Sequence, residues 1–530
     1  MANTFDIKKI FKGGALVLFV LVLLLLGAQL FFGDQIMFLA KYFTGTPVSH
    51  SSAEKLTIAY ALPVQSLEPT LFDPTSRSRL INVYEGLVRT DRNLKIVPAI
   101  AVSWGLVDPL HWDFTLRPHV KFHNGKEVTP DDIVASIDRA RNYTDSQLKT
   151  FLNTITELKI IDASTLRITT KTPDPLLLNK LAVVFIFPKD YTNFDSPVGT
   201  GPYEVVSWKS GGDMSLKRFS DYWGTEPFYA QVDLRTIPDK DERLAALKKD
   251  DVQLLADVPP SASCTVDNFQ KELSSCTALP NITLKTVPSL QVNFLMLNVN
   301  QGLFKEKALR QALAYALDGQ EFVKIADGYA QPIHQFVSSG VFGFNPDLKG
   351  FDFDMEKAKA ASEPIVSQSF EKLSVTLDYT TGDDVVVQYV QEQLKLLGID
   401  VVLNPLSPDD FQKKLLAGNS EMYYLGWRSE LGDASDFLES IIHSRDATGL
   451  GGQFNGTNYV NKDVDALIDS SQQDLNQKSR LKSLQDAMKI LVENDIVGIP
   501  LFETQTLFAN QNTITFEPRV DGYIYAAELR

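Results

Sequence analysis

Residues 111–141 read HWDFTLRPHVKFHNGKEVTPDDIVASIDRAR, and they hold the clearest secondary-structure signals in the chain. Between residues 111 and 123, apolar side chains alternate with polar ones and occupy positions 112, 114, 116, 120 and 122. This alternation predicts a pair of strands with one buried face and one solvated face. After the HNG turn, Thr129 and Pro130 predict the N-cap and the first position of a helix. Strands followed by a capped helix predict a mixed α/β fold.

The rest of the chain also mixes short strands with helices. The predicted strands are 56–61, 399–403 and 496–502, and the predicted helices are 306–318, 386–397 and two within 462–493. The helix at 306–318 carries an apolar stripe at helical spacing. Gly398 predicts the C-terminal end of one helix, directly before a strand. No internal repeat or low-complexity tract interrupts this pattern, which supports the α/β class.

Length and charge limit the classes of protein that fit. The chain has 530 residues and a mass of 59.1 kDa, which predicts two large lobes or three domains. A hydrophobic share of 44% with 22% charged residues is typical of a globular protein. Because the formal charge is −15, a nucleic-acid partner is excluded, since phosphate binding needs a dense basic surface.

An uncharged apolar run occupies residues 13–33, GGALVLFVLVLLLLGAQLFFG. Its 21 residues suffice to cross a bilayer, and the lysines before it predict that residues 1–12 are cytoplasmic. We therefore predict a single-pass anchor in the cell membrane, a tether over residues 34–54, and an extracellular or periplasmic main domain. A cleaved signal peptide is the alternative, although the run is long for one and no clear small-x-small site follows it.

The chain has two cysteines, Cys264 and Cys276. They exclude a four-cysteine zinc module, and neither lies near residues 13–33, which excludes a lipid-anchored lipoprotein. In an exported domain their closeness in sequence predicts a disulfide that closes a short loop. Two buried free thiols are the alternative.

Paired carboxylates raise the question of a hydrolase. Each pair, Asp131-Asp132 and Asp409-Asp410, follows a Ser/Thr-Pro dipeptide, so we interpret both as acids in the first turn of a capped helix. His119 and His123 resemble a metal pair, but four strand residues span about 13 Å, too far for one ion. No common nucleophile, phosphate-loop or metalloprotease motif occurs. We predict no enzyme activity, no metal and no cofactor.

Residues 426–433 read GWRSELGD and follow a predicted strand at 422–425. A strand end of this kind can offer backbone groups, a stacking surface and a carboxylate to one ligand. A solvated loop with a core tryptophan is the alternative.

Five motifs together resemble the family 5 extracellular solute-binding proteins of ABC importers, the dipeptide- and oligopeptide-binding group. They are residues 84–141, residues 199–224 with GTGPYEVVSW and DYWG, LRQALAYALD at 309–318, the segment around Trp427, and IPL at 499–501. The resemblance covers about residues 55–530. It implies an α/β, two-lobed, periplasmic-binding-protein-like clamp of type II, with discontinuous lobes and an extra subdomain in lobe I.

The resemblance also implies boundaries and a mode of action. Lobe I is expected to hold residues 55–82, 200–287 and 505–530, with 83–199 as its inserted subdomain and 288–504 as lobe II. The lobes are expected to close over the ligand about a hinge, which is a shift of population rather than catalysis.

In peptide-binding members of the family, an extended peptide adds as a strand to backbone from both lobes. Gly426, Trp427 and Arg428 match the lobe II strand, and Asp73, Pro74 and Thr75 fall about where the lobe I strand lies. The family's aspartate for the peptide α-ammonium corresponds to Glu430 here, and Asp433 is a second candidate for that role. Arg428 is a candidate for holding a carboxylate, with a surface arginine as the alternative.

The resemblance implies a monomeric, membrane-tethered receptor that captures short peptides for an ABC permease driven by a cytosolic ATPase. Other solutes known for relatives, such as a nickel chelate, haem or an oligosaccharide, are the alternative within this fold. An extracellular hydrolase, or an adhesion or signalling receptor without a permease, are alternatives of other classes.

Overall fold

The computed structural model describes residues 54–256, 258, 281–446 and 451–530, which belong to one compact unit. The predicted anchor at residues 13–33, most of the tether, and the predicted disulfide between Cys264 and Cys276 lie outside the described residues. These three expectations therefore stay predictions. Within the ranges that the structure describes, no helix combines the length and the apolar character that a membrane span needs.

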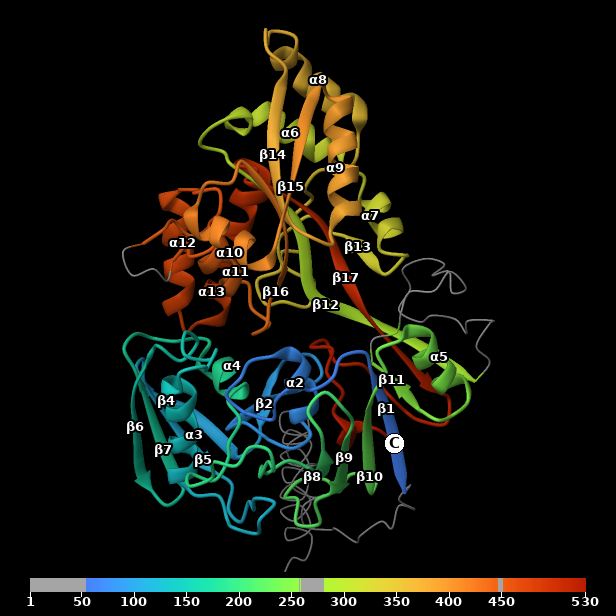
Figure 1. The fold of residues 1–530 in the computed structure, drawn as a ribbon. Coiled ribbons are helices and arrows are strands. Elements are labelled where there is room, and N and C mark those ends of the chain that lie inside the picture. Colours follow the sequence, from blue (N-terminus) through green and yellow to red (C-terminus); the bar gives the residue numbers. More distant parts are fainter. Residues whose placement is uncertain (1–53, 257, 259–280, 447–450) are drawn as a thin grey trace, which may run out of the picture. The chain divides into compact units, whose positions relative to one another are not determined.

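Two long antiparallel strands form the middle of the main sheet, β12 (Ile282–Leu297) and β17 (Gly498–Gln511) (Figure 1). The strand order is β15-β14-β16-β12-β17-β11-β1-β10-β9-β8, with β13 paired to β17. Strand β16 pairs with Gln291–Leu297 of β12, whereas β11 pairs with Ala509 and Asn510 of β17. Asn510 lies opposite Thr283, near the start of β12, whereas β16 pairs with the other end of β12. The strands that follow β16 in the sheet order and those that follow β11 therefore flank opposite ends of the β12–β17 ribbon.

The shorter strands of this sheet complete its two sides. Their bounds are β1 Lys55–Tyr60, β8 Tyr203–Trp208, β9 Met214–Arg218, β10 Gln231–Thr236, β11 Leu254–Leu255, β13 Ala330–Pro332, β14 Leu373–Thr380, β15 Ile399–Leu406 and β16 Met422–Arg428. Two smaller sheets lie between β1 and β8 in the sequence. They consist of β2 Val88–Thr90 with β3 Ile96–Pro98, and of β4 Ala101–Asp108, β5 His111–Leu116, β7 Thr165–Thr170 and β6 Ile155–Asp162 in that order.

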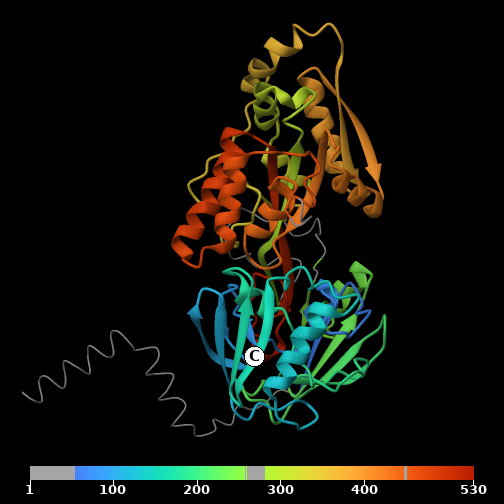
Figure 2. The same ribbon diagram turned by 90° about the vertical axis from the view of Figure 1, so that its left-hand side faces the viewer.

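Helices cover the sheets on both sides of the ribbon, as the two views show (Figures 1 and 2). Their bounds are α2 Pro74–Leu80, α3 Pro130–Asn142, α4 Leu177–Ala182, α5 Lys240–Lys248, α6 Lys307–Ala316, α7 Gly319–Ile325, α8 Met355–Val366, α9 Asp384–Leu396, α10 Pro408–Ala417, α11 Ser435–Phe437, α12 Lys462–Gln473 and α13 Gln477–Lys489. Single π-helical turns extend α11 and α13, over Leu438–Ile442 and Ile490–Asn494. Short 3₁₀ turns lie at Leu303–Lys305 and Ala526–Glu528.

The predicted helix caps are confirmed. Thr129 begins α3, and the carboxylate of Asp132 accepts hydrogen bonds from the Thr129 backbone N–H and hydroxyl at 2.8 and 2.6 Å. Ser407 caps α10 by accepting from the backbone N–H of Asp410 at 3.2 Å. Both acid pairs are therefore used in helix starts, where they offset free N–H groups and the positive helix end.

The alternating stretch ends earlier than the pattern predicts. Strand β5 stops at Leu116, and His119 adopts a positive φ of 60°, so a turn separates the two apolar runs. Beyond it, Lys121 forms an isolated bridge with Glu127. His123 is instead packed against the backbone near Gly201, its Nε2 3.0 Å from that carbonyl oxygen. Among the described residues no cluster of three or more metal-ligating side chains occurs.

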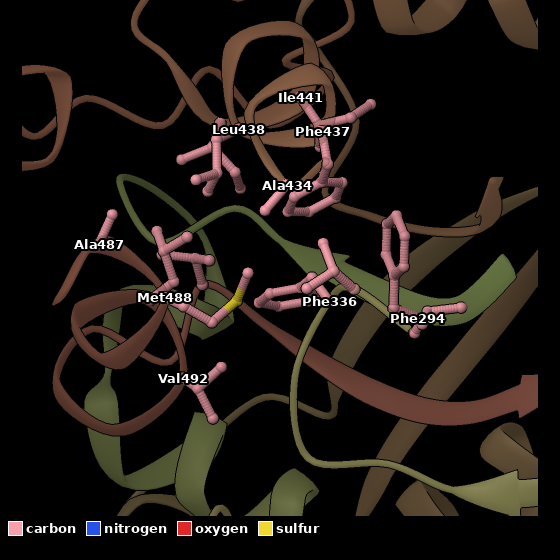
Figure 3. Packing of buried hydrophobic residues seen from close by; sticks show 14 of the residues in the cluster. Phe294, Phe336, Ala434, Phe437, Leu438, Ile441, Ala487, Met488 and Val492 are labelled. Carbon is pink, nitrogen blue, oxygen red and sulfur yellow. The ribbon is translucent and has the colours of Figure 1, made fainter. Parts of the chain in front are cut away.

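Separate hydrophobic cores lie on the two sides of the ribbon. One core joins β12 and β16 to α11, α12 and α13, where Phe294, Phe336 and Phe437 pack together (Figure 3). The ring centroids of Phe336 and Phe437 lie 5.3 Å apart in a stacked arrangement. A second core joins β1, β8, β9 and β10 to residues 508–529, and a third fills the space between α3 and the four-stranded sheet. Each part is thus stabilised by its own apolar interior.

The ribbon changes register where it passes between the cores. The pairing of β12 with β17 shifts between Pro288 and Val292, and Leu290 has a φ of 63° although it is buried. A non-glycine residue in this region is strained by about 1–3 kcal/mol. The break bends the ribbon between its two halves.

Candidate functional site

A cavity lies where both sides of the sheet meet. Its empty space is about 890 Å³, part of it open to solvent. Three parts of the N-terminal half line it, namely α2, the stretch from residue 81 to 94 and the end of α4. Arg428 at the end of β16, Glu430 and Leu431 just after it, and four residues between 519 and 525 also line it.

Arg428 and Glu430 are the two predicted site residues that line the cavity. Arg428 donates two hydrogen bonds at 2.6 Å, to the backbone oxygens of Ser289 and Asp521. Its Nε lies 3.1 Å from a carboxylate oxygen of Glu430. Arg428 therefore holds Glu430 at the cavity wall while its own charge is matched within the protein.

Gly426 and Trp427 directly precede Arg428 on β16 and do not line the cavity. Trp427 packs at the edge of the core shown in Figure 3, with ring centroids 6.4 Å from Phe437 and 6.5 Å from Phe454. Among the strands that the structure describes, Tyr424–Arg428 pair with β12 alone, because β14 reaches only Met422 and Tyr423. The other edge of β16 is thus unpaired beside the cavity wall.

Asp433 lies in the core rather than at the cavity. Its two carboxylate oxygens accept hydrogen bonds of 2.7 Å from Arg480, and one of them also caps the backbone N–H of Ser435 at 3.0 Å. Both charged side chains are buried. The carboxylate is therefore used internally, and we do not retain Asp433 as a ligand contact.

The expectation of a strand at Asp73, Pro74 and Thr75 is wrong, because these residues begin helix α2. The Asp73 carboxylate accepts from the backbone N–H groups of Thr75 and Ser76 at 3.2 and 2.7 Å. An aspartate N-cap followed by proline is a helix start of the same kind as the one at Thr129. None of the three residues lines the cavity.

Helix α2 instead carries Arg77 to the cavity wall, which the sequence did not indicate. The side chain is 3% exposed, and its guanidinium lies over the rings of Phe185 and Phe72 at 4.3 and 4.8 Å. Burial lowers the pKa of Arg77, while the neighbouring Tyr523 and Glu430 oppose that shift. Arg89 also lines the cavity, with its guanidinium 5.8 Å from the ring centroid of Tyr525.

Glu85 forms a second buried carboxylate at the cavity. It accepts hydrogen bonds from Trp223 Nε1 at 2.6 Å, Thr200 Oγ1 at 2.9 Å and the Tyr222 hydroxyl at 3.0 Å. Burial raises the pKa of Glu85, whereas these three donors lower it. Glu85, Trp223 and Thr200 belong to the recognised sequence motifs, yet nothing in those motifs indicated that they meet.

Comparison with known proteins gives a consistent picture. Residues 95–449 match the family described as bacterial extracellular solute-binding proteins, family 5 middle. The glutathione-binding protein GsiB of Salmonella typhi is 26% identical over 494 residues, which cover 88% of this chain and 92% of GsiB. These relatives are solute-binding proteins rather than enzymes.

Solved structures share the fold. The periplasmic binding protein DppA of Helicobacter pylori, in complex with the peptide STSA, has a TM-score of 0.69 at 23% identity, covering 89% of this chain and 98% of DppA. NikA of Brucella suis, in complex with Fe(III)-EDTA, has a TM-score of 0.75 at 22% identity, covering 90% and 99%. The predicted α/β, two-lobed clamp of type II is thereby confirmed. With the family match spanning well over half of its residues, the chain belongs to the family 5 extracellular solute-binding proteins of ABC importers.

Proposed function

We propose that this protein captures short peptides in the cavity and delivers them to an ABC permease. The observation that carries the proposal is the unpaired edge of β16 beside Glu430, at a cavity that both sides of the sheet line. An extended peptide can add to such an edge through main-chain hydrogen bonds, which do not depend on its side chains. GsiB and DppA, which bind glutathione and a peptide, support this class of solute.

Glu430 is the proposed partner of the peptide α-ammonium. Arg428 orients the Glu430 carboxylate. In peptide-binding relatives, the position that corresponds to Glu430 carries an aspartate that holds the peptide α-ammonium. Gly426 and Trp427 supply backbone on the proposed peptide edge. A Cβ on Gly426 would lie 2.5 Å from the Gln291 side chain, so glycine lets that side chain pack against the strand.

Closure of the clamp is proposed to trap the solute, with the register break around Leu290 as the hinge. The proposed lobes are those of the sequence-based boundaries, 55–287 with 505–530 on one side and 288–504 on the other. A solute that contacts both lobes favours the closed form by its extra contacts there. The solute is released unchanged, so the protein acts as a receptor and not as an enzyme.

The proposed setting is the outer face of the cell membrane. Residues 13–33 would hold the monomeric receptor near its permease, whose cytosolic ATPase drives import. An intact N-terminus in the membrane fraction would support the tether, and a mature N-terminus after residue 33 would overturn it.

A non-peptide solute remains the second candidate, because the Arg428 ion pair already occupies one oxygen of Glu430. Isothermal titration calorimetry with glutathione, trialanine and tetraalanine tests peptide capture, with Fe(III)-EDTA as the non-peptide probe. Micromolar binding of a peptide, recovered intact by mass spectrometry, is expected. Binding of the chelate alone would overturn peptide capture, and cleavage of the peptide would overturn the receptor role.

A further inference from the structure

Arginines outnumber carboxylates along the wall of the cavity. Four arginines and three carboxylates line it, namely Arg77, Arg89, Arg428 and Arg519 with Glu85, Glu430 and Asp521. Glu528 does not line the cavity, but it pairs with Arg519 and so brings the carboxylates around these arginines to four. The relevant question is therefore which of the arginines lacks a direct partner.

Two of the arginines have partners within the protein. Arg519 Nη2 lies 2.7 Å from Asp521 Oδ2, and a second carboxylate, Glu528, lies 3.5 Å from Arg519 Nη1. Arg428 is matched by Glu430 and by two backbone oxygens. Both arginines therefore have direct partners within the protein.

Glu85 does not form a direct ion pair with either of the other two arginines, Arg77 and Arg89. Its oxygens accept hydrogen bonds from the neutral groups of Trp223, Thr200 and Tyr222. Its charge attracts Arg89 through space, without a direct hydrogen bond between the two in the part of the chain that the structure describes. Glu85 is thus coordinated by uncharged donors rather than by an arginine.

Arg77 forms no direct ion pair among the described residues, although Glu430 attracts it through space and Tyr523 interacts with its guanidinium. The side chain is almost fully buried, and its Nη1 has no hydrogen-bond partner among the described residues. The rings of Phe72 and Phe185, which lie under the Arg77 guanidinium, cannot accept a conventional hydrogen bond from Nη1. A buried donor without a partner costs about 1–3 kcal/mol, and more when it is charged. Arginine cannot avoid this cost by losing its proton.

Arg89 repeats the pattern at the same cavity. Its Nε is buried and also lacks a partner among the residues that the structure describes. Two guanidinium groups with open donors on one cavity wall match the oxygens of a carboxylate, which accepts paired N–H donors from arginine.

We propose that a carboxylate of the solute binds Arg77, with Arg89 as a second contact, so that the receptor selects carboxylate-bearing solutes. This inference rests on the solute capture proposed above and specifies its substrate class. In a short peptide, the carboxylate is the C-terminal group or an acidic side chain. In a small organic acid, it is the acid group itself. The positive charge at Arg77 then offsets the anion in a place from which water is largely excluded.

The test compares trialanine with trialanine amide, which differ in the C-terminal carboxylate. Calorimetry is carried out on the wild type and on Arg77→Gln. We expect the wild type to bind the free acid about tenfold or more tightly than the amide, a typical effect for one charge-assisted hydrogen bond. Arg77→Gln is expected to abolish this preference, with the amide affinity within about twofold of wild type. Arg77→Lys is expected to recover part of the preference, since it keeps the charge but not the planar fork.

Arg141→Gln is the matched control. Arg141 lies on α3, pairs with Asp138 at 3.2 Å and does not line the cavity. It is expected to leave both affinities unchanged. Thermal unfolding of each variant shows whether it folds, and Arg89→Gln gives a second reading of the same site if Arg77→Gln does not fold.

Glutarate, a dicarboxylate without a peptide bond, separates this inference from peptide capture. Stabilisation of the wild type by glutarate that Arg77→Gln loses, without binding of any peptide, would overturn peptide capture and support the carboxylate site. Equal binding of trialanine and its amide would overturn the carboxylate site and leave peptide capture standing. The absence of binding by trialanine, its amide and glutarate would overturn both.

Discussion

The side-chain amide of Asn179 on α4 donates a hydrogen bond of 3.0 Å to the backbone oxygen of Leu431. The bond joins the segment before β8 to the loop after β16, and both residues line the cavity. Leu94 makes a second contact between these two parts of the chain, here through apolar packing against the core shown in Figure 3. A Cβ on Gly432 would lie 2.7 Å from Leu94 Cδ1. With the lobe boundaries proposed above, both contacts join the two lobes.

Asn179→Ala is therefore expected to weaken solute binding by about fivefold to tenfold, since one neutral hydrogen bond contributes about 1 kcal/mol. The protein stability should change little, because the bond joins two parts with separate cores. Calorimetry and thermal unfolding measure the two effects. Asn142→Ala on α3, away from the cavity, is the control, and an unchanged affinity for Asn179→Ala would contradict the role in closure.

Glu430→Gln tests the amine contact. Loss of one partner of a buried charge pair costs about 2–5 kcal/mol, so peptides with a free amine are expected to bind at least about thirtyfold more weakly. N-acetylated peptides lack the ammonium and should be affected far less. Glu392→Gln on the exposed face of α9 is the control. Equal losses for both kinds of peptide would show that Glu430 acts on the fold and not on the amine.

Asp433→Asn is expected to lower the free energy of unfolding by about 3 kcal/mol or more, because it leaves the buried Arg480 charge without its partner. Urea unfolding of the wild type and the variant measures the difference. Asp347→Asn replaces an exposed aspartate and is expected to change stability by less than about 0.5 kcal/mol. A similar small change for Asp433→Asn would show that the ion pair is not structural.

Glu503 on β17 predicts a dependence of stability on pH. Burial raises the pKa of Glu503 above its usual value of 4.5, although Ser338 and Ser339 donate hydrogen bonds to it and oppose the shift. As pH rises above 4.5, Glu503 loses its proton in the unfolded state while it still holds that proton in the folded state. The stabilisation of the folded state by the protonated Glu503 is therefore present at low pH and is lost as pH rises towards the raised pKa.

Glu503→Gln removes this titration. The stability of the variant relative to wild type is expected to increase as pH rises from about 4.5 and to level off above the raised pKa. Urea unfolding at pH 4, 6 and 8 measures the trend. A difference that stays constant across this range would contradict a raised pKa.

Local signals in the sequence predicted local structure well. The Thr129 and Ser407 caps, the stop at Gly398 and the apolar stripe of α6 depend on neighbouring residues, and the structure confirms them. Asp73-Pro74 carries the same capping signal, and applying that rule there would have predicted α2 instead of a strand. The family motifs correctly predicted the fold class, because a set of motifs in order reports the whole topology.

The cavity wall was harder to predict. Arg77 and Tyr523 lie far apart in sequence, and only the fold places them together. Nothing in the local pattern distinguishes Arg77, which lacks a partner at Nη1, from Arg480, which holds Asp433 in the core. The roles of Arg428 and Glu430 follow from their neighbours, and those neighbours come from three distant segments.

The pairing of β11 with the far end of β17 has a consequence for the order in which the protein can fold. Residues 508–529 supply Phe508, Phe516 and Ile524 to the core built on β1, β8, β9 and β10, and Asn82 exchanges hydrogen bonds with Ile524 and Ala526. A ribosome makes the strands of that core first and these residues hundreds of codons later. The N-terminal half therefore stays incomplete until synthesis has passed residue 529. A chain that must be exported before it folds gains from this delay, since its first-made part cannot close its core early.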